Sequence, residues 1–406
     1  MTLTPIPGGV CAAQGFRANG VLCGIKPSRK TPDLALIVSD TAASAAAVYT
    51  KNLVKGAPLL VTKEHLRSGT ARAVIANSGN ANTCNADGIA VAEAMCLLVE
   101  QHAQIPAGEV VVASTGVIGQ PLPLARVEAG MAALAAGLSR EGGSPAAQAI
   151  MTTDTFAKEA AVEFTLGGRA CRLGGMAKGS GMIHVNMATM LAFVTTDAAV
   201  SPGILEELLT ECSAATLNMV SVDGDTSTND MCCVLANGMA GNAPVTGPGD
   251  DLDSLRAALT QVLAELAKML ARDGEGASKL LACRVTGASS LADARLAAKG
   301  VISSSLFKAA MFGADANWGR VLCALGYCGA RIDPSKVSVS FSSSAGELHV
   351  CANGAGIAFS EELAARILAE DEIVIAVGLG DGTAMATAWG CDLTYDYVKI
   401  NGDYRT

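Results

Sequence analysis

Residues 174–198 read GGMAKGSGMIHVNMATMLAFVTTDA. Four glycines and Lys178 lead into the tetrapeptide 186–189, and the apolar run that follows is typical of a buried strand. We therefore expect Thr189 to stand where a glycine-rich loop meets a buried strand. A hydroxyl at such a position is held rigidly and has open backbone on one side.

A threonine hydroxyl is a weak nucleophile and needs a base, and no histidine or acid in this stretch has an obvious claim to that role. Taken alone, Thr189 would be read as an ordinary β-branched strand residue. Breaking the Ala188–Thr189 bond would give Thr189 a free α-amine with a pKa of about 7.7–8.0, a base already tethered to the hydroxyl. The hydroxyl could make the cut itself by attacking the Ala188 carbonyl, which gives an ester that water hydrolyses.

The composition predicts a large core of small aliphatic side chains. The chain has 406 residues, of which 50% are hydrophobic but only 4% aromatic, and this length leaves room for two domains. The net charge of −9 argues against nucleic acid or an anionic membrane surface as a partner. No apolar run approaches the roughly 18–20 residues that span a bilayer. The N-terminal segment MTLTPIPGGVC lacks the basic and apolar regions of a signal peptide.

The thirteen cysteines include no C-x-x-C pair, and the four histidines show no metal-ligand spacing. We expect free thiols that serve as small core residues in a reducing cytoplasm, and no metal site. The segment GGMAKGSG leads into a strand pattern rather than a helix, which argues against a phosphate-binding loop.

Periodicity and turn signals divide the chain into an α/β part and a smaller α+β part that starts near residue 281. In the first part we expect strands at 33–40, 71–77 and 109–114 and helices at 88–101, 123–138, from Ser201-Pro202, and 251–272. In the second part we expect strands at 281–287, 336–341 and 347–352, helices at 289–301 and from Ser360, and a closing hairpin with its turn at Asp381-Gly382.

The stretch KGSGMIHVNMATMLAFVTTDA (178–198) resembles the signature of the ornithine acetyltransferase family over its whole length. Similar matches recur in the family's order along the chain: VIANSGNAN (74–82), ASTGVIG (113–119), AIMTTDT (149–155), SVDGDTSTND (221–230), ARDGEGASK (271–279), ANWGR (316–320) and YVKINGDYRT (397–406). Together they extend from residue 74 to residue 406. The resemblance therefore rests on eight motifs rather than one.

The resemblance implies a role for each matching residue. Thr189 would be the nucleophile, freed by self-cleavage between Ala188 and Thr189, and Thr115 and Gly116 would form the oxyanion hole, as backbone N–H and hydroxyl donors at a glycine turn can. The residues implied in substrate binding are Thr152, Lys178, Thr189, Glu275, Asn401 and Thr406. A lysine can pair with a carboxylate and a glutamate with an ammonium group, which suits amino-acid substrates. Thr153 is adjacent to Thr152, so that assignment could shift by one.

The sequence departs from the family pattern at three places. Val185 and Ala316 stand where proline is usual, and Gly402 replaces a usual alanine. Loss of a proline at 185 frees the backbone near the cut, which could slow cleavage. None of the three changes removes a group that does chemistry.

The resemblance implies an α/β fold: a layered αββα sandwich of the self-processing N-terminal-nucleophile type over residues 1–280, and a smaller α+β domain over 281–406 whose tail returns to the active site. Cleavage would give an α chain of residues 1–188 and a β chain of residues 189–406, assembled as a heterotetramer of two α and two β chains in the cytoplasm.

The implied reaction is acetyl transfer from N-acetylornithine to glutamate by a ping-pong route in arginine biosynthesis, without metal or organic cofactor. Acetyl-CoA is a second donor in some relatives, and the sequence does not decide whether it is one here. Two alternatives stay open: a self-processing amidase or aminopeptidase of related fold, in which water accepts the acyl group, and a non-enzymatic binding protein whose loop stays uncut.

Overall fold

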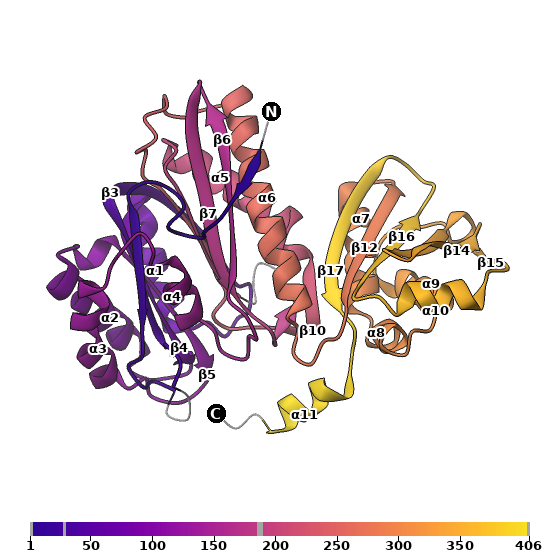
Figure 1. Cartoon of the computed structure of the whole chain (residues 1–406), viewed down its shortest axis with the longest axis horizontal. Coiled ribbons are helices and arrows are strands. Elements are labelled where there is room, and N and C mark those ends of the chain that lie inside the picture. Colours follow the sequence, from indigo (N-terminus) through magenta and orange to yellow (C-terminus); the bar gives the residue numbers. More distant parts are fainter. Residues whose placement is uncertain (1–2, 27–29, 185–189, 404–406) are drawn as a thin grey trace.

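The computed structural model describes residues 3–26, 30–184 and 190–403. Two mixed β-sheets stand on either side of the long helix α6 (Asp250–Arg272), and the remaining helices pack on the sheets or at their ends (Figure 1). The sequence-based prediction of a mixed α/β fold is confirmed.

The first sheet has nine strands, all of which precede α6 in the chain. In spatial order they are β1 (Thr4–Ile6), β6 (Lys158–Leu166), β7 (Arg169–Lys178), β9 (Leu191–Thr196), β11 (Met231–Ala236), β3 (Leu34–Tyr49), β4 (Thr70–Asn80) and β5 (Val110–Val117), with β2 (Phe16–Val21) paired to β3.

The second sheet has eight strands and takes two of them from the first part of the chain. In spatial order they are β15 (Ala355–Gly356), β14 (Gly346–Ala352), β13 (Ser338–Ser343), β16 (Glu372–Gly378), β12 (Leu280–Ala288), β17 (Ala384–Cys391), β10 (Val220–Thr226) and β8 (Ile183–His184). The division into domains at residue 280 stays a prediction; β12 begins there, while β8 and β10 precede it.

The helices follow the apolar periodicity of the sequence, and those predicted at 88–101, 123–138 and 251–272 are confirmed with small differences at their ends. The helices are α1 (Ala57–His65), α2 (Gly88–Ala103), α3 (Leu124–Ala136), α4 (Gly143–Ala149), α5 (Pro202–Ala215), α6, α7 (Leu291–Ser303), α8 (Ser305–Phe312), α9 (Trp318–Tyr327), α10 (Glu361–Leu368) and α11 (Tyr395–Asp403).

Alternation along the central strands packs both faces of the first sheet. Ala192 and Val194 of β9 belong to the core formed with α5 and α6, whereas Leu191 and Phe193 belong to the core formed with α4. Successive side chains of a strand point to opposite faces of the sheet, so a strand that contributes to two cores needs apolar residues on both faces. Strands β9 and β11 are buried throughout.

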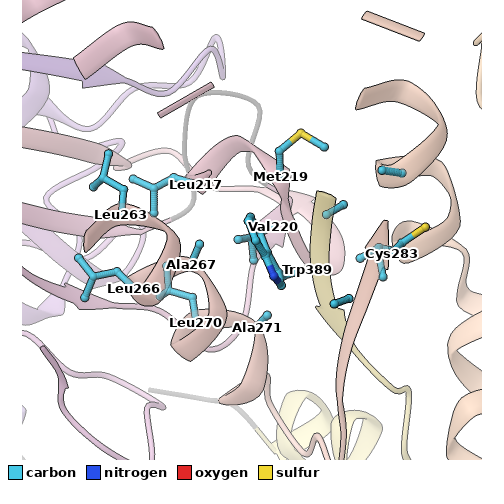
Figure 2. Close-up of a cluster of buried hydrophobic side chains, with 14 of the residues drawn as sticks. Leu217, Met219, Val220, Leu263, Leu266, Ala267, Leu270, Ala271, Cys283 and Trp389 are labelled. Atoms are coloured by element: carbon cyan, nitrogen blue, oxygen red, sulfur yellow. The ribbon is translucent and has the colours of Figure 1, made fainter. Parts of the chain in front are cut away.

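Helix α6 joins the two sheets. Its apolar stripe packs against β6 and β7 of the first sheet and against β10, β12 and β17 of the second. Figure 2 shows Leu266 and Leu270 of α6 in one cluster with Val220, Cys283 and Trp389 from the second sheet. This continuous core holds in place the loops that run between the sheets.

One sequence prediction was wrong: residues 372–391 do not form a hairpin. Strand β12 lies between β16 and β17, parallel to the first and antiparallel to the second. The turn passes over the end of β12, where the N–H of Leu379 donates to Thr286 O (2.9 Å) and the N–H of Asp381 to Gly287 O (2.8 Å). The local turn signal is present, but tertiary pairing inserts a buried strand between the two arms.

All thirteen cysteines lie within the described residues, and none forms a disulfide. Eight of them are buried, as expected for small core residues. Among the described helices, none has the length and apolar character needed to cross a membrane.

Candidate active site

A cavity of about 150 Å³ opens between the two sheets, at the ends of β5 and β7 and beside α11. Its walls are loops and strand ends from widely separated parts of the chain, and polar and apolar residues both line it. The lining residues are Ala81, Thr115, Gly116, Ile118, Thr152, Thr153, Lys178, Gly181, Met182, Met190, Leu191, Ser227, Thr228, Asn229, Asp230, Glu275 and Asn401.

The end of β5 brings Thr115 and Gly116 to the cavity. Gly116 has a φ of +136°, and a Cβ there would lie 2.3 Å from the backbone carbon of Gly79. Only glycine fits, because the backbones of β4 and β5 approach closely at this point. Thr115 and Gly116 both line the cavity, and a threonine hydroxyl with backbone N–H groups is the type of donor set that an oxyanion requires.

Lys178, the last residue of β7, places a buried ammonium group on the cavity wall. Its Nζ donates to Thr152 Oγ1 (2.7 Å) and lies 3.9 Å from Asp154 Oδ2. Burial lowers the pKa of Lys178, and the attraction of Asp154 offsets this only in part. Burial also acts on Asp154, but Lys178 and Lys158 outweigh it and hold the pKa of Asp154 below its ordinary value.

Glu275 faces the same cavity from the loop between α6 and β12. Its backbone N–H donates to Ser180 O (3.0 Å), and its Oε2 accepts from Asn401 Nδ2 of α11 (2.8 Å). A Cβ on Gly181 would lie 2.2 Å from Glu275 Oε2, so the glycine makes room for this carboxylate. A cation and an anion thus line one small cavity, which suits a ligand that carries both charges.

The loop between β10 and β11 supplies Asn229, which is 5% exposed. Its Nδ2 donates to Ala81 O (2.5 Å) and Ser114 O (3.0 Å), and its Oδ1 accepts from the hydroxyls of Thr83 and Thr228 (2.6 Å each). The side chain therefore ties the ends of β4 and β5 to the β10–β11 loop.

Most of the residues singled out from the sequence share this cavity. Thr115, Gly116, Thr152, Lys178, Glu275 and Asn401 all line it. Thr153 lines it as well, and Thr152 is the one that accepts the hydrogen bond of Lys178. Ala188, Thr189 and Thr406 lie outside the described residues; Met190, which follows Thr189 in the chain, lines the cavity.

Sequence reasoning missed the individual roles of Ser227, Thr228, Asn229 and Asp230 on the cavity wall. They all belong to the matching segment SVDGDTSTND, which was the available signal, but nothing local shows which of its polar residues turn inward. Among the residues that the structure describes, no three His, Cys, Asp or Glu side chains cluster as a metal site.

The ArgJ family model matches residues 17–406. The chain belongs to the ArgJ family. The predicted family is therefore confirmed, and with it the predicted class of enzyme, an acyltransferase of arginine biosynthesis.

Relatives within the ArgJ family are similar along their whole length. The arginine biosynthesis bifunctional protein ArgJ of Symbiobacterium thermophilum is 53% identical over 99% of both chains. That of Caldanaerobacter subterraneus is 50% identical over 97% of both. Among solved structures, the arginine biosynthesis bifunctional protein argJ of Bacillus halodurans is 43% identical with a TM-score of 0.50. The match covers 53% of this chain and 100% of that chain.

Proposed function

We propose that this member of the ArgJ family transfers the acetyl group of N-acetylornithine to glutamate through an acetyl ester on Thr189. The observation that carries the proposal is the pairing of charges in one cavity: the buried ammonium of Lys178 and the carboxylate of Glu275 line it together with Thr115 and Gly116.

The two charges match the two ends of the donor. N-acetylornithine carries an α-carboxylate and a side-chain ammonium, with the acetyl group on the α-nitrogen. Lys178, steadied by Thr152, would bind the carboxylate, and Glu275, held by Asn401, would bind the ammonium. The acetyl carbonyl would then face Thr115 and Gly116.

The chemistry needs no group beyond those of the chain and its substrates. The hydroxyl of Thr189 attacks the acetyl carbon, its proton passes to the α-amine of the same residue, and Thr115 and Gly116 stabilise the oxyanion. The C–N bond breaks as that proton moves to the leaving nitrogen, which releases ornithine. The amine of glutamate then attacks the ester, its proton returns to Thr189, and N-acetylglutamate leaves.

This route requires cleavage between Ala188 and Thr189, since only a free α-amine makes Thr189 its own base. The extent of the match to the Bacillus halodurans structure supports it. That whole chain corresponds to 53% of this one, and the segment 189–406 that cleavage would release is likewise a little over half of the sequence.

We further infer that the two cleaved chains assemble as a heterotetramer, that acetyl-CoA is a second donor, and that the enzyme works in the cytoplasm. The word bifunctional in the names of the relatives supports a second donor. The thirteen free thiols favour a reducing compartment.

The first experiment is the intact mass of the purified protein beside its Thr189→Ala variant. We expect two fragments in the wild type, one with the mass of segment 1–188 and one with the mass of segment 189–406, and a single chain in the variant. An uncut wild-type chain would remove the mechanism and leave Thr189 an ordinary strand residue.

The second experiment separates transfer from hydrolysis. Wild-type protein is supplied with N-acetylornithine, with and without glutamate, and both ornithine and N-acetylglutamate are measured. Transfer predicts that ornithine release beyond one equivalent of enzyme depends on glutamate. Equal ornithine release without glutamate would favour the amidase alternative, in which water accepts the acyl group.

A further inference from the structure

Lys158, the first residue of β6, is a charged side chain with no exposed surface. Its ammonium lies between two carboxylates, 2.7 Å from Asp154 Oδ1 and 2.5 Å from Asp273 Oδ2. It also lies 4.9 Å from the ring centre of Phe156. Lys158 is not among the described residues that line the cavity. The cluster of Lys158, Asp154 and Asp273 is therefore a buried ion triad beside the cavity rather than part of its surface.

One carboxylate of the triad holds the lysine side of the cavity. Asp154 Oδ1 accepts the N–H of Gly179 (2.6 Å), and Oδ2 accepts the N–H of Thr152 (2.9 Å). Gly179 follows Lys178 in the chain, and Thr152 accepts the hydrogen bond of that lysine. Asp154 thus fixes the backbone on both sides of the contact between Thr152 and Lys178.

The other carboxylate holds the glutamate side. Asp273 stands two positions before Glu275, and its side chain accepts the N–H of Thr155 (3.0 Å). Its backbone carbonyl accepts the hydroxyl of Ser180 (2.6 Å), and Ser180 O accepts the N–H of Glu275 (3.0 Å). Any movement of Asp273 would therefore shift the loop that carries Glu275.

Burying three charges is costly, and an apolar cluster of similar volume is often as stable. What the triad supplies is a fixed geometry. Because the ammonium bonds to both carboxylates, it sets the distance between the two chain segments that carry Asp154 and Asp273. Here the backbone of Asp273 carries Glu275, and the side chain of Asp154 holds the N–H of Gly179, the residue that follows Lys178. The spacing matters because a ligand held at both ends binds well only when both partners are at the right distance.

We propose that Lys158 is a positioning residue that sets the distance between Lys178 and Glu275, and so makes the enzyme prefer donors that carry a charge at each end. This inference rests on the proposed function, in which Lys178 binds the carboxylate and Glu275 the ammonium of the donor. Lys158 acts through Asp154 and Asp273 and touches neither the donor nor the acyl group.

The test compares N-acetylornithine with N-acetylnorvaline, which has the same carbon chain and carboxylate but no side-chain amine. The quantity measured is the ratio of kcat/KM for the two donors. This ratio does not depend on the fraction of active enzyme, so a loss of folded protein does not affect it. In Lys158→Met we expect the preference for N-acetylornithine to fall at least tenfold.

The matched control is Lys308→Met. Lys308 is a buried lysine whose Nζ donates to Val222 O, and it does not line the cavity in the described part of the chain. This variant loses a buried ammonium group as Lys158→Met does, but no ion pair with Asp154 or Asp273, so the donor ratio is expected to stay within twofold of wild type.

The outcomes separate the inference from the proposed function. An unchanged ratio in Lys158→Met, within twofold of wild type, overturns the positioning role of Lys158. A wild-type enzyme that shows no preference overturns it together with the pairing of Glu275 and the donor, and a wild type without acetyl transfer overturns the proposed function itself. If Lys158→Met does not fold, the ratio of kcat/KM for the two donors is measured in the double variant Lys158→Met/Asp273→Asn. This variant has one buried negative charge fewer, and the ammonium link between the two side chains is still absent. The same tenfold fall in the ratio is expected.

Discussion

Asn229 is the residue whose removal tests most directly how the oxyanion side of the cavity is built. Its amide makes four hydrogen bonds, to the carbonyls of Ala81 and Ser114 and from the hydroxyls of Thr83 and Thr228. We expect Asn229→Ala to lose both stability and activity.

The expected loss in the free energy of unfolding follows from the number of hydrogen bonds that Asn229→Ala removes. Each hydrogen bond contributes about 0.5–1.5 kcal/mol net, so four of them give roughly 2–6 kcal/mol. The hydroxyl of Thr83 also lies 3.2 Å from Ala81 O and keeps that partner. Three hydrogen bonds are then lost without replacement, which places the expected loss at about 1.5–4.5 kcal/mol. Ser114 directly precedes Thr115 and Gly116, so freeing its carbonyl should lower kcat/KM at least tenfold.

Asn242→Ala is the matched control. Asn242 is 7% exposed and does not line the cavity in the part of the chain that the structure describes. Its Oδ1 accepts the N–H of Ala199 (2.8 Å), and its Nδ2 donates to the carbonyls of Ala243 (2.8 Å) and Ala199 (3.3 Å). It should lose a comparable amount of stability while kcat/KM stays within twofold of wild type.

The assay combines urea denaturation with acetyl-transfer kinetics on the same preparations of both variants and the wild type, each corrected for the fraction of cleaved chain. If Asn229→Ala and Asn242→Ala lose equal stability and equal activity, the link between Asn229 and the oxyanion donors is refuted. If Asn229→Ala keeps wild-type stability, the hydrogen-bond accounting is wrong.

Three further predictions concern charge. Because burial holds the pKa of Lys178 below its ordinary 10.5, its ammonium loses its proton at a lower pH than a solvated lysine does. Inhibition by N-acetylnorvaline should therefore weaken as the pH rises toward 10.5, and it should weaken more in wild type than in Lys178→Arg; an equal pH dependence in both would contradict this. Glu275→Gln should lower kcat/KM for N-acetylornithine by about 10–100-fold, the loss of one charge-assisted contact, but for N-acetylnorvaline by less than threefold; equal losses would show that Glu275 does not meet the ammonium. Burial and Lys299 lower the pKa of His184 from 6.5 to about 4, so between these pH values the unfolded state binds more protons and the free energy of unfolding falls as the pH falls. In His184→Gln the fall in the free energy of unfolding from pH 7 to pH 5 should be smaller than in wild type by about 1 kcal/mol, after discounting for partial exposure. Melting curves at both pH values that match wild type would refute this.

Local patterns in the sequence were enough for the elements that form through their own periodicity. The apolar stripe and the following Gly274 defined α6, and Ser201-Pro202 marked the start of α5, because helix packing and helix starts depend on residues three or four positions apart. The eight segments that resemble the family likewise named six of the residues that line the cavity.

Pairing between distant strands could not be predicted in this way. The turn at Asp381-Gly382 is a local signal, but whether its arms pair with each other or flank β12 depends on which buried strand competes for their edges. Nothing near the turn in the sequence carries that information.

The sequence alone therefore determined the family, the main helices and most of the residues around the cavity. Only the tertiary structure decided how those residues are held. Lys158 reads as an ordinary lysine at the start of a strand, and its two carboxylate partners lie 4 and 115 positions away. Asn229 meets partners up to 148 positions away. Such groups bear on function because burial leaves a charge or an amide no water to bind, so its partners must come from whichever segments the fold brings beside it.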